Sequence, residues 1–272
     1  AEALPRRLRF TTTTRAVYPF GTGNVLVQFD DHNLEYLAVV DPARVDAEPD
    51  DRWSFARFNR DFLARNGPGF SMVVFKSRDR EREAERFRDA GFLAHPFGFA
   101  RAAKAPDGTD AEVSFELLFA EAPLLSDAGL FACRHLHAPE LFYKPQYQSH
   151  PNTATGVSAV LMAALEPAAV AETLAIATGG AHRGGRFGEA VAFGPDSFEI
   201  LGPDMIREAY GVPVHVPASG LRHVGFRIAV ADPSALRACL SRNDVAFEES
   251  GAVTVVGPAA GGGTVYVFEP AG

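Results

Sequence analysis

The sequence predicts an α+β fold built from repeated βαβββ units. Along the 272 residues, the order of one strand, one helix and three strands occurs three times. Two of the predicted first strands end in an acid-proline pair, Glu166-Pro167 and Asp232-Pro233, and proline fits the first turn of a helix. Each pair precedes about three helical turns of sequence, a common helix length. The repetition of these signals indicates one structural unit used several times.

The opening segment reads as the same unit without its first strand and most of its helix. Strands joined by tight turns form a meander, and aromatic residues then recur at roughly helical spacing. The first ten residues read like the end of a helix that runs straight into a strand, so we expect residues to precede this numbering. The predicted elements are a β-prone stretch over 9–17, a turn over 21–24, strands over 25–29 and 34–40, and helical spacing over 46–66.

Three complete units follow, each with strands marked by alternation and a helix marked by its 3.6-residue period. In the last unit, strict alternation predicts that Val224, Phe226, Ile228 and Val230 pack on the helix. The predicted strand, helix and three strands are 70–75, 79–90, 97–102, 111–120 and 130–137, then 157–164, 168–178, 185–187, 189–193 and 198–201, then 223–230, 234–242, 245–248, 253–256 and 264–268.

The composition bounds the partners and the location of the chain. The residues are 47% hydrophobic and 22% charged, with a net charge of -8, and no basic block indicates a nucleic-acid partner. No apolar run approaches a membrane span. The two cysteines, Cys133 and Cys239, form no CxxC pair, which fits a reducing cytoplasm. We expect a small-molecule ligand, no nucleic acid or membrane, and a homodimer as the candidate assembly.

A histidine-rich stretch ends the first complete unit and leads into the second. His135 and His137 share one face of a predicted strand and could both bind a divalent metal as neutral imidazoles. Alternatively, His135 faces a ligand and His137 marks the solvated end of the strand. His150 precedes Pro151, so its backbone is extended, and its ring either stabilises the loop or contacts a ligand.

Four short motifs accompany the unit pattern. They are PFGTGN over 19–24, LEYL over 34–37, Cys133 to His135 followed by Pro139-Glu140, and His150 to Asn152. The unit pattern resembles the vicinal oxygen chelate superfamily over nearly the whole chain, and the motifs look most like its glyoxalase-like branch (glyoxalase, bleomycin resistance, dioxygenase type). The resemblance implies curled mixed sheets enclosing a cavity, with one pair of units over 1–148, its first unit truncated, and another over 149–272.

The resemblance also implies a set of site residues. Glu35 would be a metal-binding carboxylate that moves a proton, although an exposed carboxylate on a half-solvated sheet is the alternative. First-strand histidines are ligands in metal-binding members, so His223 could bind metal with Glu269, which could instead be a turn residue before Pro270. The implied metal ligands are Glu35, His135, His223 and Glu269, and the implied ligand-binding residues are Asn24, His135, His150 and Arg227.

The function implied by the resemblance is a metal-dependent lyase or isomerase of the glyoxalase type. A divalent metal would chelate and polarise substrate oxygens while Glu35 moves a proton. The alternatives are a non-catalytic binding protein of the bleomycin-resistance type and an extradiol-type dioxygenase, which needs two histidines and one carboxylate. The turn over 21–24 is followed by a strand and no lysine, so no nucleotide cofactor is expected. We expect Asn24, Glu35 and His135 around one cavity, with His150 near its rim.

Overall fold

The computed structural model describes residues 2–47, 52–105 and 107–271, which form two compact units. Unit 1 comprises Ala1–Gly69, Pro145–Ser158 and Gly225–Gly272, and unit 2 comprises Phe70–Lys144 and Ala159–Val224. Each unit takes segments from both sides of residue 148, and the expected domains 1–148 and 149–272 stay a prediction. No helix within the described residues has the length and apolar character needed to cross a membrane.

The βαβββ order recurs three times with the same strand pairing. In each repeat the first strand runs parallel to the last strand, as in β4 with β7, β8 with β11 and β12 with β15. The hairpin strands of each repeat are antiparallel neighbours. These mixed sheets confirm the predicted α+β class and the predicted repeat.

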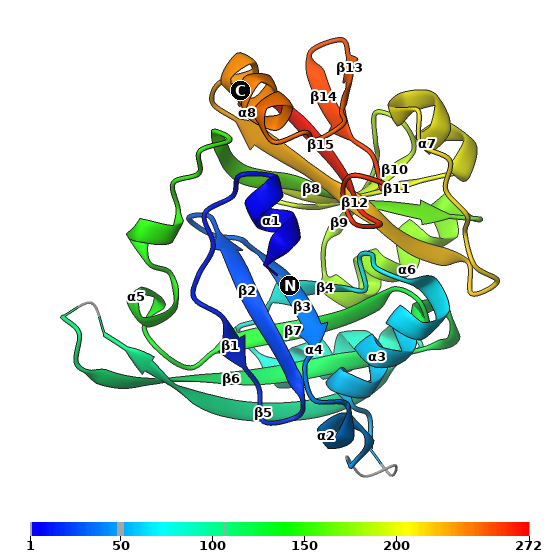
Figure 1. Cartoon of the computed structure of the whole chain (residues 1–272). Helices are drawn as coiled ribbons and strands as arrows, with labels where there is room; N and C mark the ends of the chain where they lie inside the picture. The colour runs from blue at the N-terminus through cyan, green and yellow to red at the C-terminus, as the bar shows by residue number, and fades with distance from the viewer. Residues whose placement is uncertain (1, 48–51, 106, 272) are drawn as a thin grey trace. The chain divides into compact units, whose positions relative to one another are not determined.

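The strands of each unit form two sets of neighbours (Figure 1). In unit 1 their orders are β1-β2-β3 and β13-β14-β15-β12, and in unit 2 they are β4-β7-β6-β5 and β8-β11-β10-β9. Strands β8 (Ala154–Ala164) and β12 (Leu221–Val230) have residues in both units. The other elements of unit 1 are α1 (Ala3–Arg7), β1 (Ala16–Val17), β2 (Thr22–Gln28), β3 (Asn33–Val39), α2 (Pro42–Asp46), α3 (Phe55–Asn66), the 3-10 helix η2 (Pro145–Tyr147), α8 (Pro233–Arg242), β13 (Glu248–Ser250), β14 (Val253–Val256) and β15 (Val265–Pro270). Those of unit 2 are β4 (Met72–Lys76), α4 (Arg80–Asp89), β5 (Leu93–Lys104), β6 (Asp110–Glu121), the 3-10 helix η1 (Pro123–Leu125), β7 (Gly129–His135), α5 (Pro139–Phe142), α6 (Pro167–Thr178), β9 (Ala181–Gly184), β10 (Glu189–Phe193), β11 (Asp196–Leu201) and α7 (Pro203–Tyr210).

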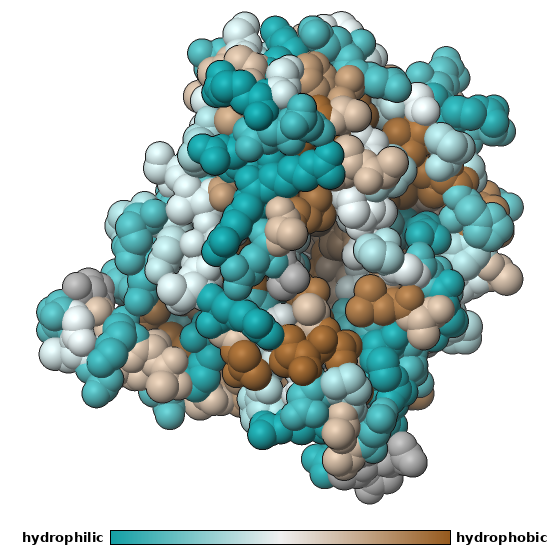
Figure 2. All heavy atoms as spheres, viewed as in Figure 1, coloured by the Kyte–Doolittle hydropathy of each residue, from teal (hydrophilic) through white to brown (hydrophobic). Residues whose placement is uncertain are grey.

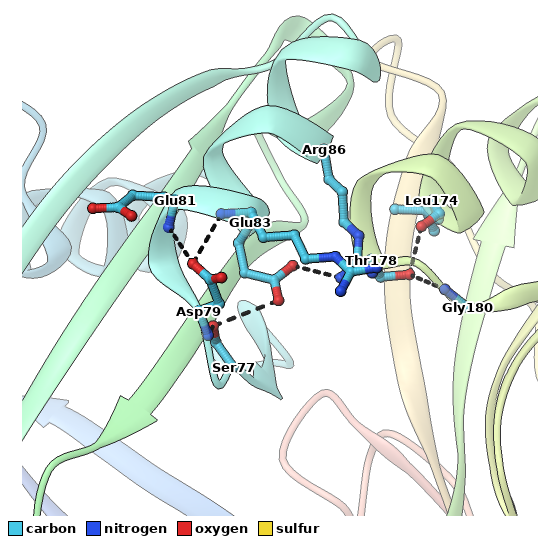
Figure 3. Close-up of polar contacts among 9 residues, drawn as sticks. Ser77, Asp79, Glu81, Glu83, Arg86, Leu174, Thr178 and Gly180 are labelled. Carbon is cyan, nitrogen blue, oxygen red and sulfur yellow. Dashed lines mark hydrogen bonds and ion pairs between the residues drawn. The ribbon is translucent and has the colours of Figure 1, made fainter.

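Side chains at the start of helix α4 fix its first turns. The carboxylate of Asp79 accepts hydrogen bonds from the backbone N–H groups of Glu81 and Arg82 at 3.1 and 3.2 Å, which satisfies two donors that the helix leaves free. Glu83 is buried, and Nη1 of Arg86 donates to its Oε2 at 3.0 Å. Figure 3 shows Arg86 reaching from α4 toward Thr178 at the end of α6. The ion pair thus compensates a carboxylate that would be costly to bury alone.

Each unit has its own hydrophobic core. In unit 2 the buried side chains of α4, α6 and the sheets form one cluster that includes Phe87 and Leu174. In unit 1, Ile228 and Val230 of β12 pack with Leu236 of α8, and Phe226 packs partly buried against the same cluster. Because these strand residues alternate along β12, the predicted helix-facing register of this strand is confirmed at these three positions.

Some local predictions are wrong. Of the turn expected over 21–24, only Gly21 lies outside β2; its φ of 89° ends a turn that begins at Tyr18, and Thr22 to Asn24 already belong to the strand. A Cβ at Gly21 would lie 2.5 Å from the carbonyl oxygen of Asp41, so the chain needs glycine here on two counts. The strand expected over 185–187 is replaced by β9, because the glycines on either side of this stretch form the bend that returns the chain to β10.

Other elements are displaced or were not expected. The β-prone stretch over 9–17 forms a strand only at Ala16–Val17, where it pairs with β2. Within the helical spacing over 46–66, the helix is Phe55–Asn66, and residues 48–51 lie outside the described part of the chain. Helices α2 and α7 were not expected. Each begins with a proline, which is common in the first turn of a helix. Both helices are too short to show a clear helical period in the sequence.

Candidate functional site

A polar cluster in unit 1 joins Tyr18, Asn24 and Glu35. Asn24 on β2 pairs in register with Leu37 of β3, so Glu35, two residues away, is its diagonal neighbour on the same face. Nδ2 of Asn24 donates to Oε1 of Glu35 at 2.6 Å and to the hydroxyl oxygen of Tyr18 at 2.9 Å. The Tyr18 hydroxyl donates to the same Oε1 at 3.4 Å. Asn24 is buried and Glu35 is exposed, so a buried amide holds a carboxylate that reaches the surface.

Two of these three residues were predicted from the sequence. Asn24 was expected in a turn and instead lies in a strand, which is why its side chain can reach Glu35 across the hairpin. The exposure of Glu35 agrees with the alternative of a carboxylate on a half-solvated sheet. Tyr18 was missed. The antiparallel register pairs Ala16 with Asn24, so Tyr18, two residues further on, is the diagonal neighbour of Asn24 on the same face.

Aromatic rings lie next to the carboxylate. The rings of Tyr18 and Phe20 stack with centroids 5.0 Å apart, and Phe20 contacts Phe55 of α3 edge to face at 5.8 Å. Figure 2 shows hydrophobic side chains on the surface between β1 and α3, among hydrophilic ones. An apolar surface beside a few convergent polar groups is typical of sites for small organic molecules.

In unit 2, His135 and His137 lie side by side as predicted. Their rings stack with centroids 5.0 Å apart, although His137 lies past the end of β7 rather than in it. Nδ1 of His137 lies 3.1 Å from the backbone N–H and 2.9 Å from the carbonyl oxygen of Ser114. Burial, then the charges of His137 and Lys76, lower the pKa of His135 to about 4. Both imidazoles thus sit at the strand end in an environment that favours the neutral form of His135.

His150 is held by backbone groups of unit 1. Its Nδ1 accepts from the N–H of Thr11 at 3.1 Å, and its Nε2 donates to the carbonyl oxygen of Gln28 at 3.0 Å. Nδ2 of Asn152, two residues on, donates to the carbonyl oxygen of Leu8 at 2.8 Å. Both ring nitrogens of His150 thus form hydrogen bonds to the backbone. This agrees with the alternative in which the ring stabilises the loop.

His223 is likewise engaged within its own unit. Nε2 donates to the carbonyl oxygen of Gly129 at 3.0 Å, and the ring lies 5.0 Å from that of Phe70. Its Nδ1 is buried without a hydrogen-bond partner among the described residues. Burial lowers the pKa of His223 to about 4 against the two backbone hydrogen bonds that raise it. The ring is therefore a neutral core histidine.

The predicted residues Arg227 and Glu269 form an ion pair in unit 1. Nη2 of Arg227 donates to Oε2 of Glu269 at 2.6 Å, and the hydroxyl of Ser158 donates to Oε1 at 2.7 Å. Both carboxylate oxygens of Glu269 therefore already have strong donors. A metal ion at this carboxylate would have to share it with a guanidinium cation.

The expected metal pair takes one residue from each unit, since His223 belongs to unit 2 and Glu269 belongs to unit 1. No group of three or more His, Cys, Asp or Glu side chains within the described residues could hold a metal ion. The predicted ligands therefore do not fit a divalent metal, and we assign no step to one.

Glu35 and Asn24 belong to unit 1, and His135 belongs to unit 2. The expectation that these three residues surround one cavity, with His150 near its rim, stays a prediction.

The fold and these motifs define a vicinal-oxygen-chelate-type protein. The chain belongs to the Glyoxalase-like domain family, whose sequence profile matches residues 1–178. This membership confirms the resemblance noted from the sequence.

Solved structures share the fold at low sequence identity. A hypothetical protein from Staphylococcus aureus has a TM-score of 0.64 at 12% identity, covering 96% of this chain and 91% of that chain. A mutant of 4-hydroxymandelate synthase from Streptomyces coelicolor has a TM-score of 0.57 at 14% identity, with coverages of 99% and 88%. A xylose isomerase-like TIM barrel/4-hydroxyphenylpyruvate dioxygenase fusion protein has a TM-score of 0.53 at 12% identity, with coverages of 99% and 46%. No curated protein sequence matches the chain.

Proposed function

We propose that this glyoxalase-like protein binds a small organic molecule beside Glu35 and moves a proton on it, as an isomerase or lyase does. The observation that carries the proposal is the convergence of two donors, the Asn24 amide and the Tyr18 hydroxyl, on one oxygen of an exposed carboxylate. A carboxylate fixed in this way is oriented before the ligand arrives, which reduces the cost of reaching a reactive geometry.

The neighbouring residues have separate roles in this proposal. Asn24 orients the carboxylate from a buried position, and the stacked rings of Tyr18 and Phe20 contact the apolar part of the ligand. Glu35 accepts the proton from the bound molecule and returns it at another atom. His135 remains a proposed ligand-binding residue, while the hydrogen bonds of His150 and Arg227 give them roles within the fold.

A ligand screen tests the proposal. Small oxo- and hydroxycarboxylic acids would be screened by ligand-observed NMR against the full chain, and hits would be followed for exchange of carbon-bound hydrogen with deuterium from solvent. We expect Glu35→Gln to abolish exchange while the fold is kept. The matched control is Glu85→Gln, an exposed glutamate on α4, which should exchange at the wild-type rate. Equal exchange in both variants would refute the role of Glu35.

The alternative is a binding protein without catalysis. The observation that favours it is the poor fit of the predicted ligands to a metal ion, since Glu269 is paired with Arg227 and the described residues contain no three-ligand group. This function predicts ligands that bind with no exchange in the wild-type chain. Elemental analysis of the purified protein tests the poor fit itself, because stoichiometric metal would contradict it.

The cytoplasm is the location we propose. The two free cysteines, Cys133 and Cys239, support it. The assembly that we propose for testing is a homodimer.

A further inference from the structure

Strand β5 forms one edge of its sheet in unit 2. It runs over Leu93–Lys104 and, among the described residues, β6 is its one neighbouring strand (Figure 1). An edge strand leaves every second pair of backbone N–H and carbonyl groups open to another chain. Folded proteins usually keep such edges short, or protect them with proline, charge or a covering segment. With twelve residues, β5 is long for an edge strand.

The hydrogen bonds of Ser114 show which backbone groups of β5 point away from β6. Ser114 lies on β6 opposite Ala100. Its carbonyl oxygen accepts from the N–H of Leu136 at 3.0 Å, and its own N–H donates to Nδ1 of His137 at 3.1 Å, so both groups point away from β5. Opposite residues of an antiparallel pair direct their backbone groups either toward each other or both outward. The backbone groups of Ala100 therefore point to the edge of the sheet.

The same alternation applies to Gly98 and Ala102, two residues away on either side of Ala100. All three residues are exposed and have small side chains. We call them the open edge. It carries neither a charge nor a proline, so nothing in these three residues prevents another strand from pairing with them.

The two ends of the open edge are closed in complementary ways. Pro96 has no N–H to donate, and the carbonyl oxygen of Lys104 already accepts a hydrogen bond from Nζ of Lys144 at 3.0 Å. Pro96 and Lys104 lie at equal distances in sequence from Ala100, one on each side. In a two-fold antiparallel pairing of β5 with a second copy, centred on Ala100, each Pro96 lies opposite Lys104 of the other copy. The missing donor thus falls opposite the acceptor that is already used.

The side chains of the other face agree with this register. Phe99 lies opposite Arg101 of the second copy, as a non-hydrogen-bonded pair in which the two side chains are closest. Nε of Arg101 is buried without a hydrogen-bond partner among the described residues. A guanidinium beside a phenylalanine ring is attractive. Lys104 lies opposite Pro96, so the register places neither cation of β5 directly opposite another cation.

We propose that β5 pairs with β5 of a second copy of this chain, antiparallel and centred on Ala100. Gly98 and Ala102 exchange backbone hydrogen bonds across the interface, and Ala100 does so with its two-fold mate. A second copy explains the edge better than an unrelated strand does, because only a two-fold partner relates Pro96 to Lys104. The inference rests on the homodimer proposed above and names its interface, and it is independent of the chemistry proposed for Glu35.

Sedimentation of the full chain tests the inference. We expect a wild-type dimer that dissociates on dilution, because main-chain hydrogen bonds supply its affinity. Ala100→Pro removes the central donor and should raise the dimer dissociation constant at least about tenfold, while an outward-facing N–H is one that an edge strand can lose without disturbing β6. The matched control, Ala100→Thr, keeps the N–H and should dimerise as the wild type does. Circular dichroism would confirm that each variant is folded.

A disulfide test defines the register and stays decisive if Ala100→Pro does not fold. In Ala100→Cys the two new thiols lie opposite each other, with about 5.5 Å between Cα atoms, which a disulfide can span. In Ala102→Cys they are offset along the strands by about 13 Å, which a disulfide cannot span. We expect a disulfide-linked dimer from the first variant alone. The oxidised wild type is the reference, because it contains Cys133 and Cys239.

The outcomes separate the interface from the assembly. A wild-type chain that stays monomeric would overturn both this inference and the homodimer. A dimer that persists undiminished in folded Ala100→Pro would leave the homodimer standing and overturn the β5 interface. Equal cross-linking of the two cysteine variants would do the same, because it would show that the strands do not pair around Ala100.

Discussion

Asn24 donates a hydrogen bond to Glu35 from the adjacent strand, with 2.6 Å between Nδ2 and Oε1. The two residues are diagonal neighbours of an antiparallel pair, a geometry that a strand position provides and a turn position does not. A buried amide thereby determines where an exposed carboxylate points. The position of this carboxylate depends on β2 beginning immediately after Gly21.

Replacing Asn24 tests this dependence. Asn24→Leu keeps most of the volume and removes both donated hydrogen bonds, so we expect a loss of about 1–3 kcal/mol in the free energy of unfolding. Affinity for any ligand found at Glu35 should fall about tenfold because the carboxylate is no longer oriented. Urea unfolding and calorimetric titration measure the two effects. The comparison is Tyr18→Phe, which removes the 3.4 Å bond to Glu35 and the 2.9 Å bond accepted from Asn24 but keeps the 2.6 Å bond between Asn24 and Glu35. A larger effect there would contradict the role of Asn24.

The backbone contacts of His150 predict a large stability effect. His150→Phe keeps the ring contacts with Phe10 and Phe29, whose centroids lie 5.5 and 5.0 Å away, but leaves the N–H of Thr11 and the carbonyl of Gln28 without this partner. We expect unfolding by urea to show a loss of about 2–4 kcal/mol.

The control for His150 is His182→Phe. His182 lies on the exposed edge strand β9 and forms an ion pair with Glu189 of β10. Replacing His182 should therefore cost less than about 1 kcal/mol. Similar losses in both variants would show that the backbone bonds of His150 contribute little.

The buried His223 predicts a pH dependence of stability. Its pKa is about 4 in the folded chain against an ordinary value of 6.5, so between these values the unfolded chain binds more protons than the folded chain. Stability should therefore fall as pH falls from 6.5 to 4, by as much as about 3 kcal/mol from this residue. The lowered pKa of His135 acts in the same direction over the same window.

Urea unfolding at a series of pH values measures this dependence. The variant His223→Phe cannot take up the proton, so its stability should fall less steeply over the window even if it is lower at pH 7. A wild-type chain whose stability stays constant from pH 6.5 to 4, or an unchanged slope in the variant, would show that His223 is not held neutral by burial.

Replacing Gly179, which follows the last residue of α6, should lower the stability of the fold by more than backbone strain alone would. Its φ is 71°, and a Cβ there would lie 2.5 Å from the guanidinium carbon of Arg86. In Gly179→Ala the guanidinium of Arg86 has to shift, and we expect this shift to weaken its ion pair with the buried Glu83, so two costs add.

Gly91→Ala isolates the first cost, because Gly91 has a φ of 79° with nothing near its Cβ position. We expect about 1 kcal/mol for Gly91→Ala and about 1 kcal/mol more for Gly179→Ala in thermal unfolding. Equal losses would mean that Arg86 adjusts without cost.

The sequence by itself determined the repeat. Acid-proline pairs, alternation and helical periods are local signals, so they located β4, β8 and β12 and the helices α4, α6 and α8. Local signals also identified Glu35 and His135 as polar residues on apolar strands. They failed at the turn over 21–24, where two glycines suggested a longer turn than the chain makes.

Only the tertiary structure decided the roles of the polar residues. Whether a histidine binds a metal, stabilises a loop or packs in the core depends on the groups within hydrogen-bond distance of its ring. Those groups come from segments that are distant in the sequence. Thr11 and Gln28 hold His150, Gly129 holds His223, and Arg227 holds Glu269. Periodicity records which face a side chain occupies, whereas strand register and chain path determine which groups it meets there.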